Sequence, residues 1–404
     1  MPLVDMGDML HHAYQEKYAV GAFDLVSLDF LEGIIIAAEK QRAPVIISLA
    51  ESHFEYFDFD LAMAATVAAA RRCLVPVAIH LDHGASLQSA ERGIRLGCNG
   101  VMVDSSNVPF EQNVASTRAI TDMAHACGVY VEGELGYVAG VEGEDADKHP
   151  GEVVYTSVEE AASYVARTQV DCLAVSIGTV HGRMRGTPHL DFDRLARIND
   201  AIKIPLVIHG GTGLADEQYR QLIARGVTKI NYYTALADAA GAQIRANAAK
   251  DSRCGYTGLV RGVREAIAAE CERMIVLFGS AGRADAILKV ARPWREVAHV
   301  IIYNTNDQAD SGEKADPNIE QAGIEHMMAA GHAALSNIPG VRQVVTGRAI
   351  KDQAQYQYCW LIRFAQPAVI KSYHEHPAHI AFADQHFRPR ASDRISIDYE
   401  LIDP

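Results

Sequence analysis

The stretch His80-Leu81-Asp82-His83-Gly84 closes an apolar run that begins at Val77. A run of aliphatic residues that ends abruptly in ionisable side chains and a glycine is typical of a buried strand whose C-terminal end opens into a reaction site. Asp82 supplies a carboxylate and His83 an imidazole, and both groups commonly transfer protons in enzymes. Whether they act together depends on what lies at the ends of the neighbouring strands.

Apolar segments of similar length recur along residues 18–231 and alternate with amphipathic or alanine-rich segments. The alternation predicts parallel strands joined by right-handed helical crossovers. We expect strands at residues 18–23, 45–49, 77–81, 100–103, 130–134, 172–177, 206–209 and 228–231. Eight such strands close a (β/α)₈ TIM barrel, so this α/β fold is the prediction, although a doubly wound open sheet fits the same pattern.

The pattern changes after residue 282, and Pro293 and Trp294 mark a boundary. Beyond them we expect strands at 297–303, 340–346, 356–364 and 395–400, with helices at 319–336 and 366–376. These elements predict a small α+β domain of ordinary domain size. The expected domains are therefore 1–290 and 297–404.

Composition excludes several classes of function. The chain has 404 residues, 49% of them hydrophobic, and a formal net charge of −14. A negative surface argues against a nucleic-acid partner, but it permits a small phosphorylated ligand in a local pocket. We find no signal-peptide pattern and no apolar run of membrane-spanning length. Seven cysteines without a C-x-x-C pair indicate reduced thiols, so we expect a cytoplasmic protein without a membrane partner.

Polar side chains follow most of the expected strands. Because a (β/α)₈ barrel has its active site at the C-terminal ends of its strands, we expect these side chains to converge there. Three histidines, His83, His181 and His209, follow different strands, and each is followed directly by glycine. A single histidine in such a place is more often a structural residue, but three neutral imidazoles with an open fourth position suit a catalytic zinc ion.

A second pattern predicts an anion site. Gly210-Gly211-Thr212-Gly213 follows an apolar strand and precedes a helix, so its backbone N–H groups can surround an anion. A plain tight turn would explain this glycine run equally well. The next strand adds Lys229, Asn231 and Thr234, and barrel enzymes often bind phosphate with their last two loops. Phosphate is therefore the favoured ligand.

The segment 136–156 is long, acidic and rich in glycine. A solvated connection would have this composition, but long loops in compact domains are often functional lids. A lid could carry Glu142 or Glu144 into the site as a mobile acid or base.

Six separated motifs together resemble the zinc-dependent class II ketose-bisphosphate aldolases over about residues 1–287. They are the segments 21–23, 80–84, 131–136, 171–182, 209–213 and 229–231. The resemblance implies a (β/α)₈ barrel, usually dimeric or tetrameric. It also implies reversible cleavage of a ketose 1-phosphate or bisphosphate into dihydroxyacetone phosphate and an aldehyde.

The resemblance also implies roles for individual residues. His83, His181 and His209 would bind the catalytic zinc, and Asp82 would exchange the proton of the C4 hydroxyl. Glu142 would be the lid acid that exchanges a proton with the dihydroxyacetone phosphate carbon. The remaining implied sites are a second or vacated metal site at Asp104 and Glu134, and phosphate and enediolate contacts from Gly182, Gly211, Thr212, Asn231 and Thr234. A second divalent or a monovalent cation would be compatible with this set.

Lys229 is the one candidate for a rival Schiff-base mechanism, which a zinc Lewis acid would make unnecessary. We therefore expect it to contribute to substrate binding instead. His80 gains no role and is interpreted as a packed strand residue.

Three positions depart from the family pattern. Asp24 stands where the family usually has asparagine, and Ala50, followed by Glu51, stands where it usually has serine or threonine. Tyr233 stands at a position that is aspartate in one branch of the family and variable in others. Each alters the rim of the expected site, so Asp24 and Ala50 are candidate substrate contacts. Fructose 1,6-bisphosphate is the default substrate, with tagatose 1,6-bisphosphate or a ketose with another distal group as alternatives. A metal-dependent hydrolase and a non-catalytic sensor are the rival functions.

The tail from Val297 resembles the stress-responsive dimeric α/β-barrel domain, through the segment 372–382 and the strand 297–303. The resemblance implies a ferredoxin-like α+β fold for this domain. This resemblance implies a dimerisation module, so a homodimer or homotetramer is expected. The histidines at 374, 376, 379 and 386 are interpreted as packed or interface residues rather than metal ligands, because a proline interrupts their spacing.

Overall fold

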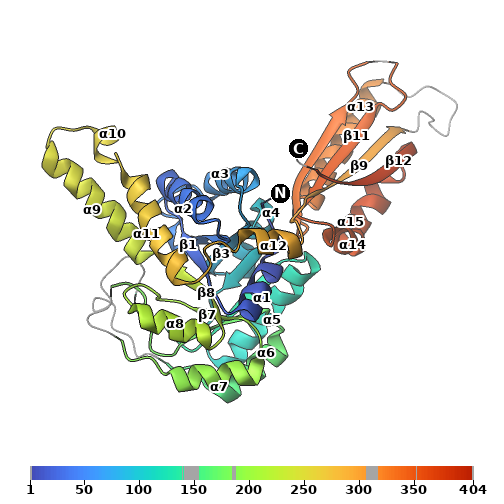
Figure 1. Ribbon diagram of the computed structural model, residues 1–404. Coiled ribbons are helices and arrows are strands. Elements are labelled where there is room, and N and C mark those ends of the chain that lie inside the picture. Colours follow the sequence, from blue (N-terminus) through green and yellow to red (C-terminus); the bar gives the residue numbers. More distant parts are fainter. Residues whose placement is uncertain are drawn as a thin grey trace. The chain divides into compact units, whose positions relative to one another are not determined.

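The computed structural model describes residues 2–138, 140, 154–183, 188–305, 317–351 and 353–402 (Figure 1). The chain forms two compact units: the first comprises residues 1–93, 98–122 and 129–293, and the second comprises residues 294–404 with the short segments 94–97 and 123–128. Within the described residues, no helix is both long enough and apolar enough to span a membrane.

The larger unit is a closed barrel in which each strand pairs in parallel with its neighbours in sequence and β8 pairs with β1. Its strands are β1 (Val20–Asp24), β2 (Val45–Ala50), β3 (Val77–Gly84), β4 (Gly100–Val103), β5 (Tyr130–Leu135), β6 (Cys172–Val175), β7 (Leu206–Ile208) and β8 (Val227–Tyr232). The predicted (β/α)₈ barrel is confirmed, and the doubly wound open sheet is excluded.

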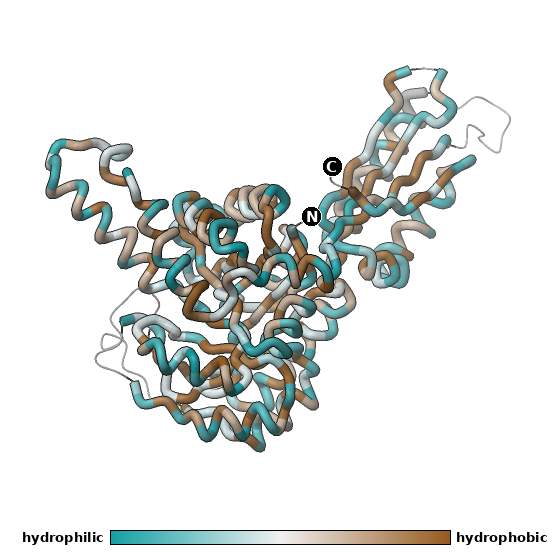
Figure 2. The backbone as a smooth tube through the Cα atoms, in the orientation of Figure 1, coloured by the Kyte–Doolittle hydropathy of each residue, from teal (hydrophilic) through white to brown (hydrophobic). Residues whose placement is uncertain are grey.

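Helices surround these strands. They are α1 (Met6–Glu16), α2 (Leu28–Gln41), the 3₁₀ helix η1 (Glu51–His53), α3 (Phe59–Arg72), α4 (Leu87–Leu96), α5 (Phe110–Ala126), α6 (Val158–Thr168), α7 (Phe192–Ile202), α8 (Asp216–Ala224), α9 (Thr234–Lys250), α10 (Tyr256–Leu259), α11 (Val263–Leu277) and α12 (Ala284–Val290). Polar and apolar residues alternate along many of them (Figure 2), as expected for helices with one face on a sheet.

The two ends of the barrel differ in chemistry. At the N-terminal end, Met6, Met9 and Leu10 of α1 pack in one buried apolar cluster with residues near the starts of several strands, including Val20 and Ala78. This cluster closes that end with apolar side chains. The polar residues that follow the strands therefore gather at the opposite end, where the active sites of such barrels lie.

The smaller unit is a four-stranded antiparallel sheet in the order β10-β11-β9-β12, with helices that pack on it. Its elements are β9 (Val297–Thr305), α13 (Pro317–Leu335), β10 (Val341–Arg348), β11 (Tyr358–Phe364), α14 (Val369–Glu375), α15 (Pro377–Phe382), the π-helical turn η3 (Ala383–Phe387) and β12 (Ala391–Glu400). Trp360, Ile362 and Phe364 of β11 are at most 1% exposed and form its core. The expected ferredoxin-like α+β fold is confirmed.

Candidate active site

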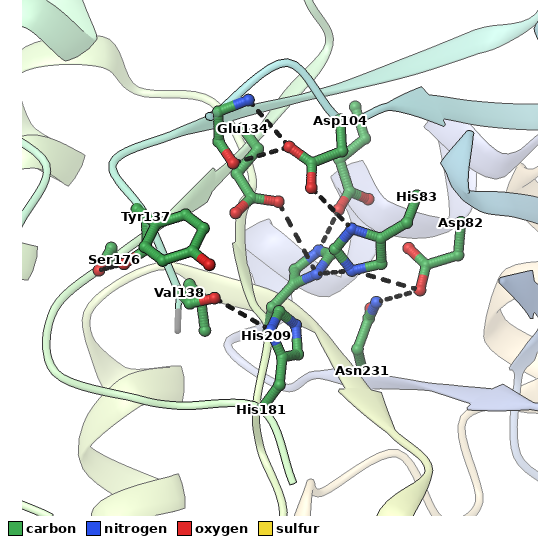
Figure 3. Close-up of polar contacts among 12 residues, drawn as sticks. Asp82, His83, Asp104, Glu134, Tyr137, Val138, Ser176, His181, His209 and Asn231 are labelled. Carbon is green, nitrogen blue, oxygen red and sulfur yellow. Dashed lines mark hydrogen bonds and ion pairs between the residues drawn. The ribbon is translucent and has the colours of Figure 1, made fainter. Parts of the chain in front are cut away.

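Three imidazoles meet at the C-terminal end of the barrel (Figure 3). His83 lies at the end of β3, His181 follows β6, and His209 follows β7. Their ring centroids lie 4.7 to 5.9 Å apart. His83 has a positive φ of 45°, a conformation that costs a side-chain-bearing residue about 1–3 kcal/mol and is concentrated at functional sites.

Each imidazole has one ring nitrogen fixed by an acceptor at the edge of the cluster. His83 Nδ1 lies 3.2 Å from Asp104 Oδ2, and His181 Nδ1 lies 3.2 Å from the Val138 carbonyl oxygen. His209 Nε2 lies 2.8 Å from Glu132 Oε1. These acceptors select the tautomer in which the other nitrogen of each ring carries a lone pair.

The three remaining nitrogens face one another. His209 Nδ1 lies 2.9 Å from His83 Nε2, and His181 Nε2 is buried without a hydrogen-bond partner among the described residues. Burial lowers the pKa of His181 to about 3, so this ring is neutral at physiological pH. Three imidazole donors within 4.8 Å of one another, each oriented by an acceptor behind it, fit a metal ion that keeps an open coordination position.

A second group of potential ligands adjoins the first. One donor atom each from His83, Asp104 and Glu134 lies within 4.8 Å of the others. Glu134 is buried, and burial together with the nearby Asp104 raises the pKa of its carboxyl well above the ordinary value. Its Oε2 has no hydrogen-bond partner among the described residues. The structure therefore brings the predicted pair Asp104 and Glu134 together beside the three histidines.

Asp82 lies against this cluster. Its side chain is fully buried, and its Oδ2 accepts a hydrogen bond of 2.9 Å from Asn231 Nδ2. Burial alone would raise the pKa of Asp82, but the nearby His83 and Lys229 outweigh it and hold this pKa well below the ordinary value. Oδ1 makes no hydrogen bond within the described chain, so an ionised carboxylate oxygen remains available as a base.

Lys229 lies inside the barrel rather than on the expected phosphate loop. Its Nζ is 2.8 Å from Glu132 Oε2 and 2.6 Å from Asn231 Oδ1, and the side chain is fully buried. Burial would lower the pKa of Lys229, but Glu132 and Asp82 raise it above the ordinary value. The ammonium group stays charged, which disfavours a Schiff base, because imine formation needs the neutral amine.

Glu132 is a residue to which the sequence reasoning assigned no role. It joins Lys229 to His209, and its Oε2 lies 3.5 Å from His80 Nε2. His80 is fully buried, and burial lowers its pKa to about 3. The spacing of Glu132 and Glu134 in one strand could have indicated this role, because residues i and i+2 lie on the same face.

The loops expected to bind phosphate lie close together. A Cβ at Gly210, which has a φ of 63°, would lie 2.3 Å from the Val180 carbonyl oxygen, so only glycine permits this approach of the loops after β6 and β7. A Cβ at Gly211 would lie 2.9 Å from the Asn231 carbonyl oxygen. Thr179, which sequence reasoning missed, is fully buried, and its hydroxyl has no hydrogen-bond partner within the described chain.

The other residues expected to contact phosphate lie at a helix start and in the loops after β6 and β7. Thr234 is buried at the first position of α9, where N–H groups at a helix start favour an anion. Gly182 follows His181 with a φ of 85°, and Thr212 follows Gly211 in the turn after β7.

The three positions that depart from the family pattern have distinct surroundings. Asp24 ends β1 and is fully buried, and Ala50 ends β2 in register with Asp82. Glu51 is turned toward the loop after β3, because its carboxylate accepts hydrogen bonds from Ala85 N (2.7 Å) and Ser89 Oγ (3.0 Å). Glu51 therefore stabilises the turn that follows the metal-binding candidates.

Tyr233 packs against a histidine that sequence reasoning also missed. The ring centroids of Tyr233 and His53 are 4.4 Å apart, and Phe30 lies 6.2 Å from Tyr233 on another side. His53 is 4% exposed, and burial lowers its pKa to about 4. Its position three residues after the second strand was the available signal. Glu142 and Glu144 lie outside the described residues, so the lid remains a prediction.

The molecule is a (β/α)₈ barrel in which three imidazoles converge beside a buried carboxylate, an arrangement typical of enzymes of the barrel class. The family model "Fructose-bisphosphate aldolase class-II" matches residues 4–283, and the model "Stress responsive A/B Barrel Domain" matches residues 297–401. The chain belongs to the class II fructose-bisphosphate aldolase family and is an aldolase with a fused A/B barrel domain. Both resemblances seen in the sequence are confirmed.

Individual proteins support this assignment. The chain is 40% identical to a fructose-bisphosphate aldolase of Geobacillus stearothermophilus over 289 residues, which cover 70% of this chain and 99% of the relative. A probable fructose-bisphosphate aldolase of Bacillus subtilis is 38% identical over 70% of this chain and 100% of its own length. The crystal structure of the YdjI aldolase from Escherichia coli K12 has a TM-score of 0.63 and 34% identity, over 70% of this chain and 99% of its own.

Proposed function

We propose that this aldolase is zinc-dependent and cleaves a ketose phosphate or bisphosphate into dihydroxyacetone phosphate and an aldehyde. The observation that carries the proposal is the set of three imidazoles, each with one nitrogen fixed by an acceptor and the other facing its neighbours. When bound there, zinc would act as a Lewis acid for the charge that develops on the substrate oxygen.

The protein's own groups account for the proton transfers. Asp82 would take the proton of the C4 hydroxyl, the electrons of that O–H bond would form the aldehyde carbonyl, and the C3–C4 bond would break with its pair left on C3. Asn231 holds one oxygen of Asp82 at 2.9 Å, so the other is positioned to act. Glu142 would return a proton to C3, as the family resemblance implies.

The anion end of the site would hold the phosphate on C1. Backbone groups at Gly182 and Gly211, with the hydroxyls of Thr212 and Thr234, would supply donors around it. Thr179 adds a buried hydroxyl that lacks a partner within the described chain. In this proposal, Lys229 positions Asn231 and Glu132 from inside the barrel and contributes its charge at a distance.

Fructose 1,6-bisphosphate is the default substrate, because the curated relatives are named fructose-bisphosphate aldolases. Asp24 and Ala50 favour a substrate whose distal group is not a phosphate. A buried carboxylate at position 24 and a methyl group at position 50 offer no donor to a phosphate at these points of the rim. Tagatose 1,6-bisphosphate, or a ketose 1-phosphate with a neutral distal end, is therefore the main alternative.

Metal removal tests the mechanism. We expect exhaustive chelation to reduce cleavage by more than 100-fold and added zinc to restore it, because zinc is the Lewis acid in this proposal. Dihydroxyacetone phosphate released from a panel of ketose phosphates is measured with a coupled dehydrogenase. Activity that survives chelation, or covalent trapping by borohydride with substrate, would contradict the zinc mechanism. Release of inorganic phosphate instead would identify a hydrolase.

We also propose that the C-terminal domain joins copies of the chain into a homodimer or homotetramer. One face of its sheet packs against helices, and the other carries apolar residues that are partly exposed, among them Val345 (38%), Ile397 (44%) and Tyr399 (49%). Strand register places Ile397 beside Val300, which faces Leu361 on the next strand. Exposed apolar patches of this kind mark interaction sites.

A charged residue on this face tests the proposed dimerisation. We expect Ile397→Lys in the full-length chain to halve the molecular mass of the oligomer at micromolar concentration, because the introduced ammonium group would be buried in the interface without a partner. Light scattering after size-exclusion chromatography measures the mass. Ile350→Lys is the matched control, since Ile350 is fully exposed. An unchanged oligomer in Ile397→Lys would refute the assignment.

A further inference from the structure

A histidine pair and a carboxylate meet in the C-terminal domain, in a group that the aldolase chemistry does not use. His299 lies on β9, Asp398 on β12 and His374 on α14. His299 Nδ1 is 2.6 Å from Asp398 Oδ1, and the rings of His299 and His374 have centroids 5.5 Å apart. One donor atom from each of the three lies within 4.8 Å of the others.

Strand pairing brings two of these side chains together. His299 and Asp398 are direct partners in the antiparallel ladder between β9 and β12, so they lie on the same face of the sheet. His299 also pairs with the buried Ile362, which places it on the face that the helices cover. A buried, ionisable side chain thus occupies a position at which the neighbouring strand β11 has the apolar Ile362.

The surroundings of the group suit a ligand site. His299 is 3% exposed and packs beside the rings of Phe364 and Tyr373. Burial lowers the pKa of His299 despite the carboxylate of Asp398. Asp398 and His374 are exposed, which leaves an open side through which solvent and ions can reach the group.

His374 differs from the other histidines of its segment. His376 Nδ1 accepts a hydrogen bond from Ala378 N and caps α15, and His379 Nδ1 lies 3.2 Å from the His374 carbonyl oxygen. His386 stacks on the ring of Phe382. Packing and capping contacts therefore account for these three. His374 is the histidine of this set whose ring lies beside His299.

We propose that His299, His374 and Asp398 form a second metal site, which binds a divalent transition ion such as zinc with two imidazole nitrogens, one carboxylate oxygen and a solvent molecule. Such a ligand set suits zinc and similar ions rather than calcium or magnesium, which prefer oxygen ligands alone. Tetrahedral coordination with bonds of about 2 Å separates ligand atoms by about 3.3 Å, so the His299–Asp398 pair would open slightly from its hydrogen-bonded distance.

A bound ion would connect β9, β12 and α14. Because β12 is an edge strand that pairs with β9 alone, the ion would hold this edge and α14 together. We infer a structural site, since each of the three ligands comes from a different element and the ion gains affinity from the folded arrangement only.

The test counts zinc in the full-length protein. After loading with zinc chloride and desalting, elemental mass spectrometry should find one more ion per chain in the wild type than in His374→Ala. The exposed position of His374 makes this variant compatible with folding. His386→Ala is the matched control and should keep the wild-type count. Equal zinc content in the wild type and His374→Ala would overturn the proposal.

A second variant tests the carboxylate. Asp398→Asn keeps an acceptor opposite His299 but removes the charge, and it should weaken binding of this ion at least 10-fold in competition with a chromophoric zinc chelator. Wild-type affinity in Asp398→Asn would also overturn the proposal. Aldolase turnover should be equal in all these proteins. If every protein, including the wild type, contained no zinc in the barrel or showed no cleavage, the result would instead count against the proposed aldolase mechanism.

Discussion

Replacement of Asp82 with asparagine is expected to lower the rate of ketose phosphate cleavage by about 10²- to 10⁴-fold, the usual contribution of a general base. The amide oxygen can still accept the hydrogen bond from Asn231, so the geometry of this position should persist. What disappears is the ionised oxygen that would take the C4 hydroxyl proton. Zinc content should remain at the wild-type level, because the three imidazoles are intact.

Two readouts separate this role from a supporting one. The exchange of the dihydroxyacetone phosphate C3 proton with solvent does not involve the C4 hydroxyl, so Asp82→Asn should retain most of it while cleavage is lost. Asp60→Asn changes an exposed aspartate, paired with Arg92, and should leave both reactions unchanged. Loss of zinc from Asp82→Asn would show that Asp82 supports the metal site instead.

Replacement of Lys229 with methionine is expected to lower the free energy of unfolding by about 3–5 kcal/mol, because it leaves the carboxylate of Glu132 buried without its ammonium partner. The burial of both groups is complete, so solvent cannot screen the remaining charge. Zinc affinity should also fall by about 10- to 100-fold, since Glu132 fixes the tautomer of His209.

Urea unfolding of the zinc-free protein, followed by circular dichroism, measures the first effect. Lys289→Met, at an exposed position of α12, is the matched control and should change stability by less than about 0.5 kcal/mol. The double variant Lys229→Met with Glu132→Gln should recover part of the loss, because no unpaired charge remains. Wild-type stability in Lys229→Met would contradict the assigned ion pair.

The barrel was predictable because its information is local in the sequence. Each strand is a short apolar run, since both faces of a parallel strand are buried, and each helix has its own periodic pattern. The convergence of His83, His181 and His209 followed from one further rule, that parallel strands present their C-terminal ends at the same side of a barrel. Residue order and strand count therefore sufficed to assemble the candidate site and, with six motifs in order, to indicate the family.

The sequence by itself thus determined the barrel, the α+β domain and the set of residues at the strand ends. Tertiary structure alone decided which nitrogen of each imidazole faces the other rings, that Lys229 lies within the barrel beside Glu132, and that His299 meets Asp398 and His374. The reason is physical: these contacts join side chains far apart in the chain, and their distances depend on strand register and on packing between elements. Periodicity in a sequence specifies which face a side chain occupies, but not the partner that it meets there.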